Sequence, residues 1–203
     1  MFRPGSRATS CLSQGIAAGT AAGAGLALLK LFPSLPLSGF AAGAARLASL
    51  FTGQPVLRIE NGWMLPDADL SIVVTEACSA TDFWLMLAAL IAGRLGARTR
   101  LYPSKNDAPA FFLPSGQASL CALFHFSRAA LCGLAAALPL AILLNALRVV
   151  VVAQAHRWFI DRFPPSYGPF LHMATGVAIF LPSLIALNVL LDLRASRRSA
   201  ATA

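Results

Sequence analysis

The sequence predicts an all-α integral membrane protein with about four transmembrane helices, with five to six as the alternative count. Apolar residues make up 57% of the 203 positions and charged residues only 12%, about half of the roughly one quarter found in soluble domains. Long apolar runs recur along the chain and are flanked by Arg or Lys, which is typical of helices that cross a hydrocarbon layer of about 30 Å. A soluble domain this apolar could not cover its surface, so we expect helices that satisfy their backbone hydrogen bonds within lipid.

The chain is expected to form one membrane-embedded domain over residues 1–203. Its expected order is span 1 at 11–32, an outer-face segment at 33–77, span 2 at 79–96, an inner-face loop at 97–128, span 3 at 129–151, an outer loop at 152–171, span 4 at 172–193 and a basic tail at 194–203. A signal peptide is the alternative for span 1. The run is long and lacks a short apolar core followed by a cleavage site, so we expect an uncleaved helix.

The outer-face segment is the one region with strand character. Residues 40–51 predict a short, weakly amphipathic helix on the membrane surface. Two extended runs within 56–65 flank an Asn-Gly pair and predict a β-hairpin, and 71–75 predict a further strand. Because this segment leads directly into Cys78, we expect a small sheet over that residue.

The predicted inner-face loop is interrupted by Pro103, Pro109, Pro114 and Gly116. Its apolar part, 119–126, is too short to cross a bilayer. We therefore expect interfacial pieces here. A tightly folded extra hairpin of spans is the alternative, and it would raise the count to five or six.

Cys78 differs from the other three cysteines in its surroundings. Cys11, Cys121 and Cys132 lie in apolar runs and are typical of small hydrophobic residues. The four cysteines form no CxxC pair and no metal-binding spacing with His. Cys78 lies instead at the junction between a polar segment and an apolar helix, where it is either buried filler or an activated nucleophile.

The residues around Cys78 favour the second reading. Ser79 and Asp82 have the spacing of a reciprocal helix cap, and Thr75 is an alternative cap. Either choice places Cys78 beside or inside the first helical turn. The unpaired backbone N–H groups there, and the positive end of the helix dipole, favour a thiolate.

Two further polar residues lie close to span ends. Arg148 lies about 5 Å from the end of span 3 at 1.5 Å per residue, where it either serves a functional site or extends to the headgroups. Asn145 lies one turn earlier on the same face and could bond the guanidinium or a substrate. His172 opens span 4, with Gly176 one turn later. A lone His at a helix start is more often an interfacial residue than a catalyst.

The distribution of charge orients the four spans. If both termini lie inside, ten cations are inside and five outside, a clear positive-inside bias. The inside cations are Arg3, Arg7, Arg94, Arg98, Arg100, Lys105, Arg128, Arg194, Arg197 and Arg198, and the outside cations are Lys30, Arg46, Arg58, Arg157 and Arg162. This topology comes from charge alone, yet it places Cys78, Arg148 and His172 at the outer ends of their helices and at similar depth.

A thiol, a cation and an imidazole are the parts of a thiol acyl-transfer site. We predict that Cys78 attacks a peptide carbonyl as the thiolate. Arg148 would stabilise the oxyanion and lower the thiol pKa, and His172 would exchange a proton with the thiol and the leaving amine. This chemistry needs no metal or organic cofactor.

Three short motifs resemble those of the exosortase/archaeosortase family. They are Glu76-Ala77-Cys78-Ser79-Ala80, Asn145-Ala146-Leu147-Arg148-Val149 and His172-Met173-Ala174-Thr175-Gly176. They are similar to that family's A-C-S-G, N-x-x-R and H-x-x-x-G motifs, in the same order. Each motif alone is weak, the ordered trio is fairly specific, and the similarity covers about the second two thirds of the chain.

The resemblance implies a cysteine protease/transpeptidase of the inner (cytoplasmic) membrane with its site on the outer, periplasmic face. It implies cleavage of a C-terminal sorting signal, commonly of the PEP-CTERM type, on exported membrane-tethered proteins through a thioester acyl-enzyme. Cys78 would be the nucleophile, and Arg148 and His172 would complete the site. The further residues that we expect to bind substrate or support the site are Asn145, Ser79, Glu76 and Gly176.

The chain departs from the family pattern in two places. Ala80 stands where many members have glycine, and Thr81-Asp82-Phe83 replaces a more usual small or basic continuation. The chain is also shorter than eight-span members. These differences indicate a divergent short member, and they leave the substrate motif and the acyl acceptor open.

Two other functions compete with this one. A non-catalytic membrane assembly or scaffold protein of the envelope would use the three residues to hold helices together. Loss of Cys78 would then be silent, while changes at Arg148 would harm folding. A small transporter ranks third, because the chain shows no internal repeat. The expected partners are the sorting signal and the lipid bilayer, with no nucleic acid, since no stretch interleaves aromatic and basic residues.

Overall fold

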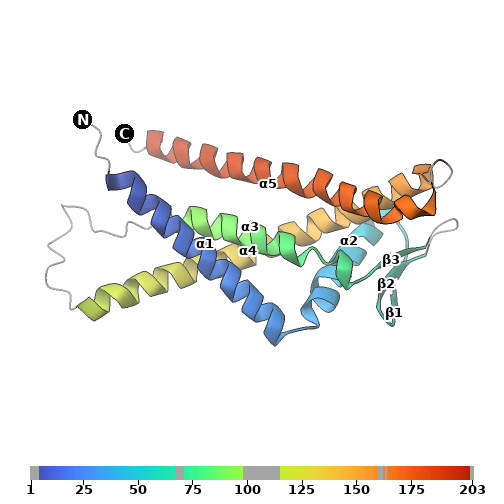
Figure 1. Ribbon diagram of the computed structural model, residues 1–203, viewed down its shortest axis with the longest axis horizontal. Coiled ribbons are helices and arrows are strands. Elements are labelled where there is room, and N and C mark those ends of the chain that lie inside the picture. Colours follow the sequence, from blue (N-terminus) through green and yellow to red (C-terminus); the bar gives the residue numbers. More distant parts are fainter. Residues whose placement is uncertain (1–4, 67–70, 98–114, 160–161, 163, 202–203) are drawn as a thin grey trace. The chain divides into compact units, whose positions relative to one another are not determined.

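The computed structural model describes residues 5–66, 71–97, 115–159, 162 and 164–201. In this part the chain is mostly helical and contains a small sheet of three strands (Figure 1). The elements are α1 (Gly5–Leu31), the π-helical turn η1 (Pro36–Ala41), α2 (Ala42–Thr52), β1 (Leu57–Ile59), β2 (Gly62–Leu65), β3 (Ile72–Val74), the 3-10 turn η2 (Glu76–Cys78), α3 (Thr81–Gly96), α4 (Ser115–Phe159), the 3-10 turn η4 (Pro165–Tyr167) and α5 (Gly168–Ala201). They belong to two compact units.

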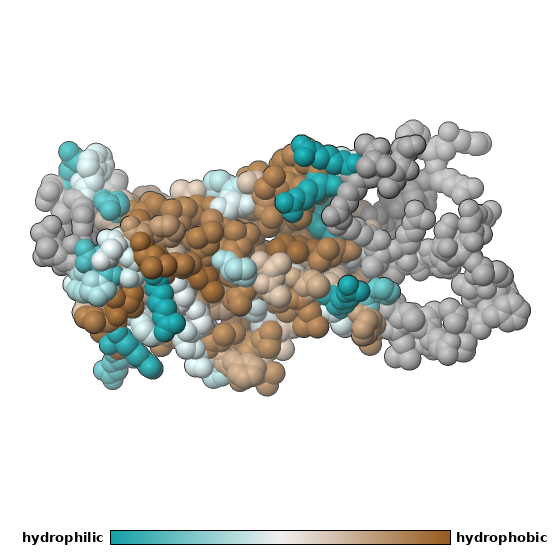
Figure 2. Space-filling model, turned by 180° about the vertical axis from the view of Figure 1, so that it is seen from behind, coloured by the Kyte–Doolittle hydropathy of each residue, from teal (hydrophilic) through white to brown (hydrophobic). Residues whose placement is uncertain are grey.

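Three helical stretches are long and apolar enough to cross a membrane: Cys11–Leu31, Leu123–Ala155 and Phe170–Arg194. Apolar side chains cover much of the face drawn in Figure 2. On α5 large apolar side chains such as Met173 and Val177 are more than half exposed. A helix that exposes so many apolar side chains is unfavourable in water and suited to lipid. The three helices therefore indicate a membrane protein.

The predicted second span, 79–96, is shorter than expected. The corresponding helix α3 begins at Thr81 and has 16 residues. At 1.5 Å per residue it is roughly 24 Å long, less than the hydrocarbon thickness of about 30 Å. The expected count of four spans is therefore not confirmed by the helices that the structure describes.

The predicted inner-face loop at 97–128 is wrong from Ser115 onward. The helix α4 begins at Ser115 and runs for 45 residues. Pro114 directly precedes it in the sequence, and proline is well tolerated at a helix start because the N–H groups there have no helical partner. The proline therefore precedes a helix where we expected it to mark a loop. Residues 98–114 of the predicted loop lie outside the described residues.

The predicted outer loop at 152–171 and the basic tail at 194–203 are also largely helical. The helix α4 continues to Phe159, and α5 covers Gly168–Ala201. Both predicted boundaries followed the apolar runs, but a helix does not end where its residues become polar. Residues 160, 161, 163, 202 and 203 lie outside the described part of the chain.

The first unit contains α1, α3 from Trp84 onward and α4 as far as Leu138. Its helices approach one another through small residues. A Cβ at Gly96 would lie 2.4 Å from the Ala17 Cβ, and one at Gly133 would lie 2.7 Å from the Ala88 carbonyl oxygen. Such close approach through Gly and Ala is typical of helix packing in lipid.

The second unit contains the sheet, α2, η2, α4 from Pro139 onward and α5. The strands pair antiparallel in the order β1-β2-β3. The alanine face of η1 and α2 packs on the sheet and on Val149 of α4, and this core contains Ala41, Ala45, Ala48, Leu65 and Val74. The helix predicted at 40–51 is therefore covered on this face by the sheet. Small residues on α2 allow the strands to lie close to it.

The hairpin turn lies one residue earlier than predicted. Ile59 pairs with Gly62, so Glu60 and Asn61 form the loop and Gly62 is the first residue of β2. Gly62 has a second constraint: a Cβ there would lie 2.5 Å from the carbonyl oxygen of Val74. Glycine at this position therefore allows the end of β3, four residues before Cys78, to lie against β2.

Candidate active site

Cys78 lies on a tight turn between a strand and a helix. After β3 the chain forms the 3-10 turn η2, in which the Cys78 amide donates to the Thr75 carbonyl oxygen at 3.0 Å. Ala80 then adopts a left-handed conformation, with φ of 57°. That residue redirects the chain, and α3 begins at Thr81.

This geometry corrects the predicted helix start. Ala80 has a non-helical φ, so Ser79 cannot be the N-cap of α3 with Asp82 as its partner. The Ser79 side chain is buried, and its Oγ lies 3.3 Å from Thr81 Oγ1. Cys78 consequently precedes the helix and does not lie within its first turn. The N-terminus of α3 is therefore not the direct cause of thiol activation.

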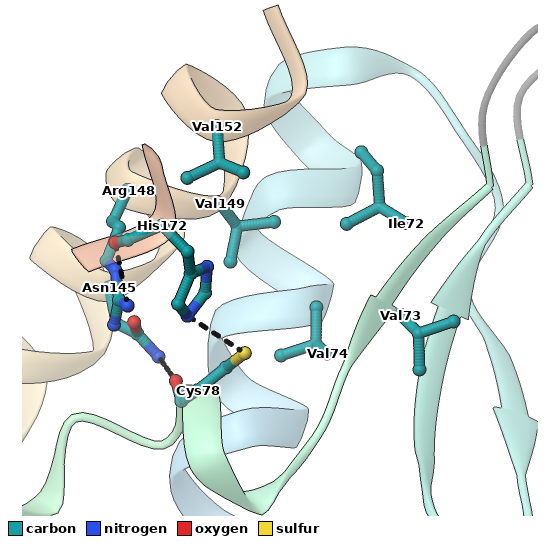
Figure 3. A pocket seen from close by; sticks show the side chains of 9 residues that line it. All are labelled: Ile72, Val73, Val74, Cys78, Asn145, Arg148, Val149, Val152 and His172. Atoms are coloured by element: carbon teal, nitrogen blue, oxygen red, sulfur yellow. Dashed lines mark hydrogen bonds between the residues drawn. The ribbon is translucent and has the colours of Figure 1, made fainter. Parts of the chain in front are cut away.

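His172 is the nearest ionisable partner of the thiol. It comes from the second turn of α5, and its Nε2 lies 3.7 Å from the Cys78 Sγ (Figure 3). Thr75 Oγ1 donates to the same sulfur at 3.9 Å. The sulfur therefore has an imidazole and a hydroxyl as polar neighbours.

These contacts explain the acidity of the thiol. Burial raises the pKa of Cys78, but the hydrogen bond with His172, the hydrogen bonds with Thr75 and the charge of the imidazolium outweigh it. Together they lower the pKa from its ordinary value of 9.0 to about 7. Near neutral pH a large fraction of Cys78 is consequently the nucleophilic thiolate.

Arg148 lies on the other side of His172. Its Nη2 donates to the His172 carbonyl oxygen at 3.2 Å, and Thr175 Oγ1 donates to the same oxygen at 3.0 Å. The Arg148 Cζ lies 5.5 Å from the centroid of the Phe180 ring, which stacks on Phe83. The guanidinium is thus held by a carbonyl and an aromatic face. Its Nε is buried and has no hydrogen-bond partner in the described part of the chain.

Asn145 supports the site through the backbone of the turn. Its side chain is fully buried, and its Nδ2 donates to the Cys78 carbonyl oxygen (Figure 3). We expected this amide to bond Arg148 or a substrate. It instead ties the backbone of the nucleophile to α4. Its Oδ1 is buried and has no partner among the described residues.

The other two predicted supporting residues differ in their placement. A Cβ at Gly176 would lie 3.3 Å from Arg148 Nε and 3.4 Å from Cζ, so the glycine leaves room for the guanidinium. Glu76 is exposed and does not line the cavity at Cys78. Its visible contribution is through the backbone, since its carbonyl accepts from the Ser79 amide at 2.9 Å.

A cavity of about 80 Å³ opens beside the sulfur. Its polar lining residues are Cys78, Asn145, Arg148 and His172, and its apolar ones are Ile72, Val73, Val74, Val149 and Val152 (Figure 3). This volume is several times the 10–15 Å³ or so that one water requires, so it has room for a small reacting group. Charges act strongly here because the apolar walls lower the local dielectric.

The sequence missed Phe180 and the sulfur contact of Thr75. Phe180 lies two turns after His172 on α5, and nothing in its surroundings in the sequence distinguishes it from the other apolar residues of that helix. Thr75 was considered only as a helix cap. In the structure it directly precedes the 3-10 turn η2, and its hydroxyl contacts the sulfur of Cys78 three residues later.

No protein-family model, curated protein or solved structure matches the chain. Within the described ranges, no group of three or more His, Cys, Asp and Glu side chains could hold a metal ion. The site presents an acidic thiol, an imidazole within proton-transfer range and a buried guanidinium whose Nε has no partner in the part of the chain that the structure describes. These groups can form and stabilise a covalent adduct at a carbonyl carbon.

Proposed function

We propose that the chain is a membrane cysteine peptidase or transpeptidase that acts through Cys78. The observation that carries the proposal is the contact between Cys78 Sγ and His172 Nε2 at 3.7 Å, which joins residues 94 positions apart in the sequence. A half-buried thiol beside an imidazole has the arrangement of a nucleophile and its base. The thiol pKa of about 7 fits attack near neutral pH.

The acylation step transfers one proton and exchanges two bonds. The Cys78 proton passes to His172 Nε2, and the sulfur attacks the substrate carbonyl carbon. A C–S bond forms, and the carbonyl π electrons move to oxygen. When the tetrahedral adduct collapses, the C–N bond breaks and His172 returns the proton to the leaving amine.

Deacylation repeats the same movements with a second nucleophile. An amine or water loses its proton to His172 and attacks the thioester carbonyl. The C–S bond breaks, and the sulfur regains the proton from His172. An amine acceptor gives a transpeptidase and water gives a protease, both through the same thioester.

Arg148 is the proposed stabiliser of the oxyanion. Arg148 lines the cavity, and its Nε is buried against Gly176 without a hydrogen-bond partner among the described residues. Its Nη2 is occupied by the His172 carbonyl. A preorganised donor in an apolar cavity stabilises developing negative charge more strongly than one in water.

The proposed substrate is the C-terminal sorting signal of an exported, membrane-tethered protein, as the family resemblance implies. The proposed setting is the inner membrane, with four spans that include α3 and with the site on the outer face. Cys78 precedes α3, Arg148 lies near the end of the apolar stretch Leu123–Ala155, and His172 lies near the start of Phe170–Arg194. All three positions fit a site close to one membrane face.

The test is processing of a co-expressed reporter that ends in a short motif, a membrane helix and a basic tail. We expect a truncated reporter with the parent protein and none with Cys78→Ala or Cys78→Ser, at equal accumulation of the enzyme. Cys132→Ser is the matched control, since Cys132 lies on α4 in the other unit. Continued processing by Cys78→Ala would refute the proposal and favour the scaffold alternative.

A further inference from the structure

A second cavity adjoins the one at Cys78. It has a volume of about 250 Å³ and lies entirely within the same unit. Ile72 of β3 lines both cavities. On α4, Val149 and Val152 line the first cavity, while Val150 and Ala153 line the second. One apolar side chain and one turn of helix therefore border both spaces.

The lining of the second cavity is polar but uncharged. Thr52, Gln54 and Gln154 supply hydroxyl and amide groups, and none of its described lining residues carries a charge. The other lining residues are apolar, as at Phe51 and Leu65. The cavity thus offers hydrogen-bond donors and acceptors without an ionic partner.

The turn that carries Gln54 is fixed. Gly53 closes α2 with φ of 72°, and the Gln54 amide donates to Thr52 Oγ1 at 3.4 Å. Ser49 Oγ donates to the Gln54 carbonyl oxygen at 2.5 Å. These bonds hold the rim of the cavity before any ligand binds, which reduces the entropy cost of binding.

The size of the cavity indicates a side chain as its occupant. Sites for whole small molecules start at about 300 Å³, and this one is smaller. Neighbouring residues of an extended peptide are about 3.3 Å apart and point to opposite faces. A peptide whose scissile carbonyl lies at the Cys78 sulfur can therefore place a nearby side chain beyond Ile72.

We propose that the second cavity is a specificity subsite that binds an uncharged, hydrogen-bonding side chain of the peptide substrate, best an Asn or Gln amide close to the scissile bond. Gln54 is half-buried and Gln154 is exposed at the cavity, and an apolar side chain would leave the half-buried Gln54 amide without a partner. A charged one would lose part of its hydration and meet no counter-charge among the lining residues. An amide satisfies both requirements. This inference rests on the proposed function, because it needs a peptide bound at Cys78.

The test uses the full-length protein in detergent with Cys78 as its sole cysteine. The probes are peptidyl acyloxymethyl ketones with Gln, Asn, Leu, Glu or Lys at each of the two residues before the ketone. The thiolate forms a C–S bond at the methylene carbon, the C–O bond breaks and a carboxylate leaves. Intact mass measures the labelling rate, and iodoacetamide measures the reactivity of the thiol alone.

We expect a Gln or Asn probe to label at least tenfold faster than the Leu, Glu and Lys probes at one of the two positions. Gln154→Leu and Gln54→Leu should each reduce this preference at least threefold, with unchanged iodoacetamide rates. Ala153→Leu should do the same by filling the cavity, and it keeps the test decisive if a Gln variant does not fold. Gln14→Leu makes the same change in the other unit and should leave the preference intact.

The outcomes separate the two proposals. Fast iodoacetamide labelling without a side-chain preference, or a preference that survives all three cavity variants, refutes the subsite and leaves the proposed function standing. The subsite proposal is also refuted if the Leu, Glu or Lys probe labels Cys78 fastest. If iodoacetamide labels Cys78 only at alkaline pH, the proposed function fails, and the subsite fails with it.

Discussion

The coupling between Cys78 and His172 can be measured as a change in thiol reactivity. In His172→Ala the hydrogen bond and the imidazolium charge are lost while burial remains, so the Cys78 pKa should return to 9.0 or above from about 7. At pH 7 the parent is about half ionised and the variant about 1% ionised, a roughly 50-fold loss of thiolate. Thiolates of higher pKa are more nucleophilic. With a Brønsted slope of about 0.4–0.5, the higher pKa of the variant increases the rate constant of its thiolate about 6- to 10-fold. The net expectation is a rate about 5- to 8-fold lower at pH 7.

The same reasoning predicts that the two pH profiles cross. Above about pH 10 both thiols are ionised, and the more basic thiolate of the variant should react about 6- to 10-fold faster than the parent. Stopped-flow absorbance with 4,4′-dithiodipyridine measures the reaction rate of the thiol in detergent, both at pH 7 and at high pH. For this measurement Cys11, Cys121 and Cys132 are replaced by Ala. His125→Ala is the matched control, because His125 lies on α4 in the other unit.

Comparison with the rate of a free peptide thiol distinguishes loss of the base from loss of the fold. An unfolded variant would react faster than the parent at high pH, but it would also react with the rate of a free peptide thiol. If the His172→Ala and parent profiles coincide between pH 6 and 10, the thiol is not activated by this imidazole and the reasoning is refuted. A shift in His125→Ala would point to a general change in the detergent-solubilised protein.

Three further substitutions test the backbone around the site. Gly62→Ala places a Cβ 2.5 Å from the Val74 carbonyl oxygen and should destabilise the protein by about 1–3 kcal/mol in denaturant unfolding; an unchanged midpoint would contradict the close approach. Ala80→Gly relieves a left-handed φ of 57° and should stabilise by about 1 kcal/mol in the same assay, with no loss of reporter processing. Gly176→Ala places a Cβ 3.3 Å from Arg148 Nε and should slow processing less than tenfold, whereas Gly176→Leu should slow it by about 100-fold. Equal rates in the two Gly176 variants would show that this approach is unimportant.

Membrane topology explains why residues far apart in the sequence could be predicted to lie close together. Apolar runs and flanking cations fix the depth of each residue, so proximity across helices becomes largely a question of depth. Cys78, Arg148 and His172 were expected at one level on this basis, and the structure places them around one cavity. Their catalytic roles stay predictions until the thiol and the reporter are assayed.

Contacts to the backbone could not be predicted in the same way. Asn145 donates to the Cys78 carbonyl oxygen and Arg148 to that of His172, and no side-chain pattern marks a carbonyl as an acceptor. Gly62 was attributed to a turn because it follows Asn61, yet its constraint is the carbonyl of Val74 on another strand. The helix boundaries failed for a related reason, since polarity does not end a helix whose backbone remains bonded.

Ala80 links the sequence departure to a physical constraint. It stands where the resembled family often has glycine, and it is the one described non-glycine residue with positive φ. The left-handed region costs an alanine about 1–2 kcal/mol and a glycine almost nothing. The turn after Cys78 therefore keeps its left-handed conformation although residue 80 is an alanine. Such a conformation is expected when surrounding contacts hold the turn. The bond from Asn145 to the Cys78 carbonyl oxygen is such a contact.

The buried guanidinium favours the enzymatic proposal over the scaffold. A structural arginine in an apolar site is expected to have its donors satisfied, because an unpaired buried N–H costs about 1–3 kcal/mol or more. Arg148 uses Nη2 on a carbonyl and its face on Phe180, and its Nε has no partner among the described residues. In the proposed reaction, attack by Cys78 on a carbonyl would form a negative charge in the cavity that Arg148 lines, and the guanidinium would stabilise that charge. The enzymatic proposal therefore predicts that Arg148 lowers a reaction barrier by stabilising this charge, whereas the scaffold alternative predicts only that it holds helices together.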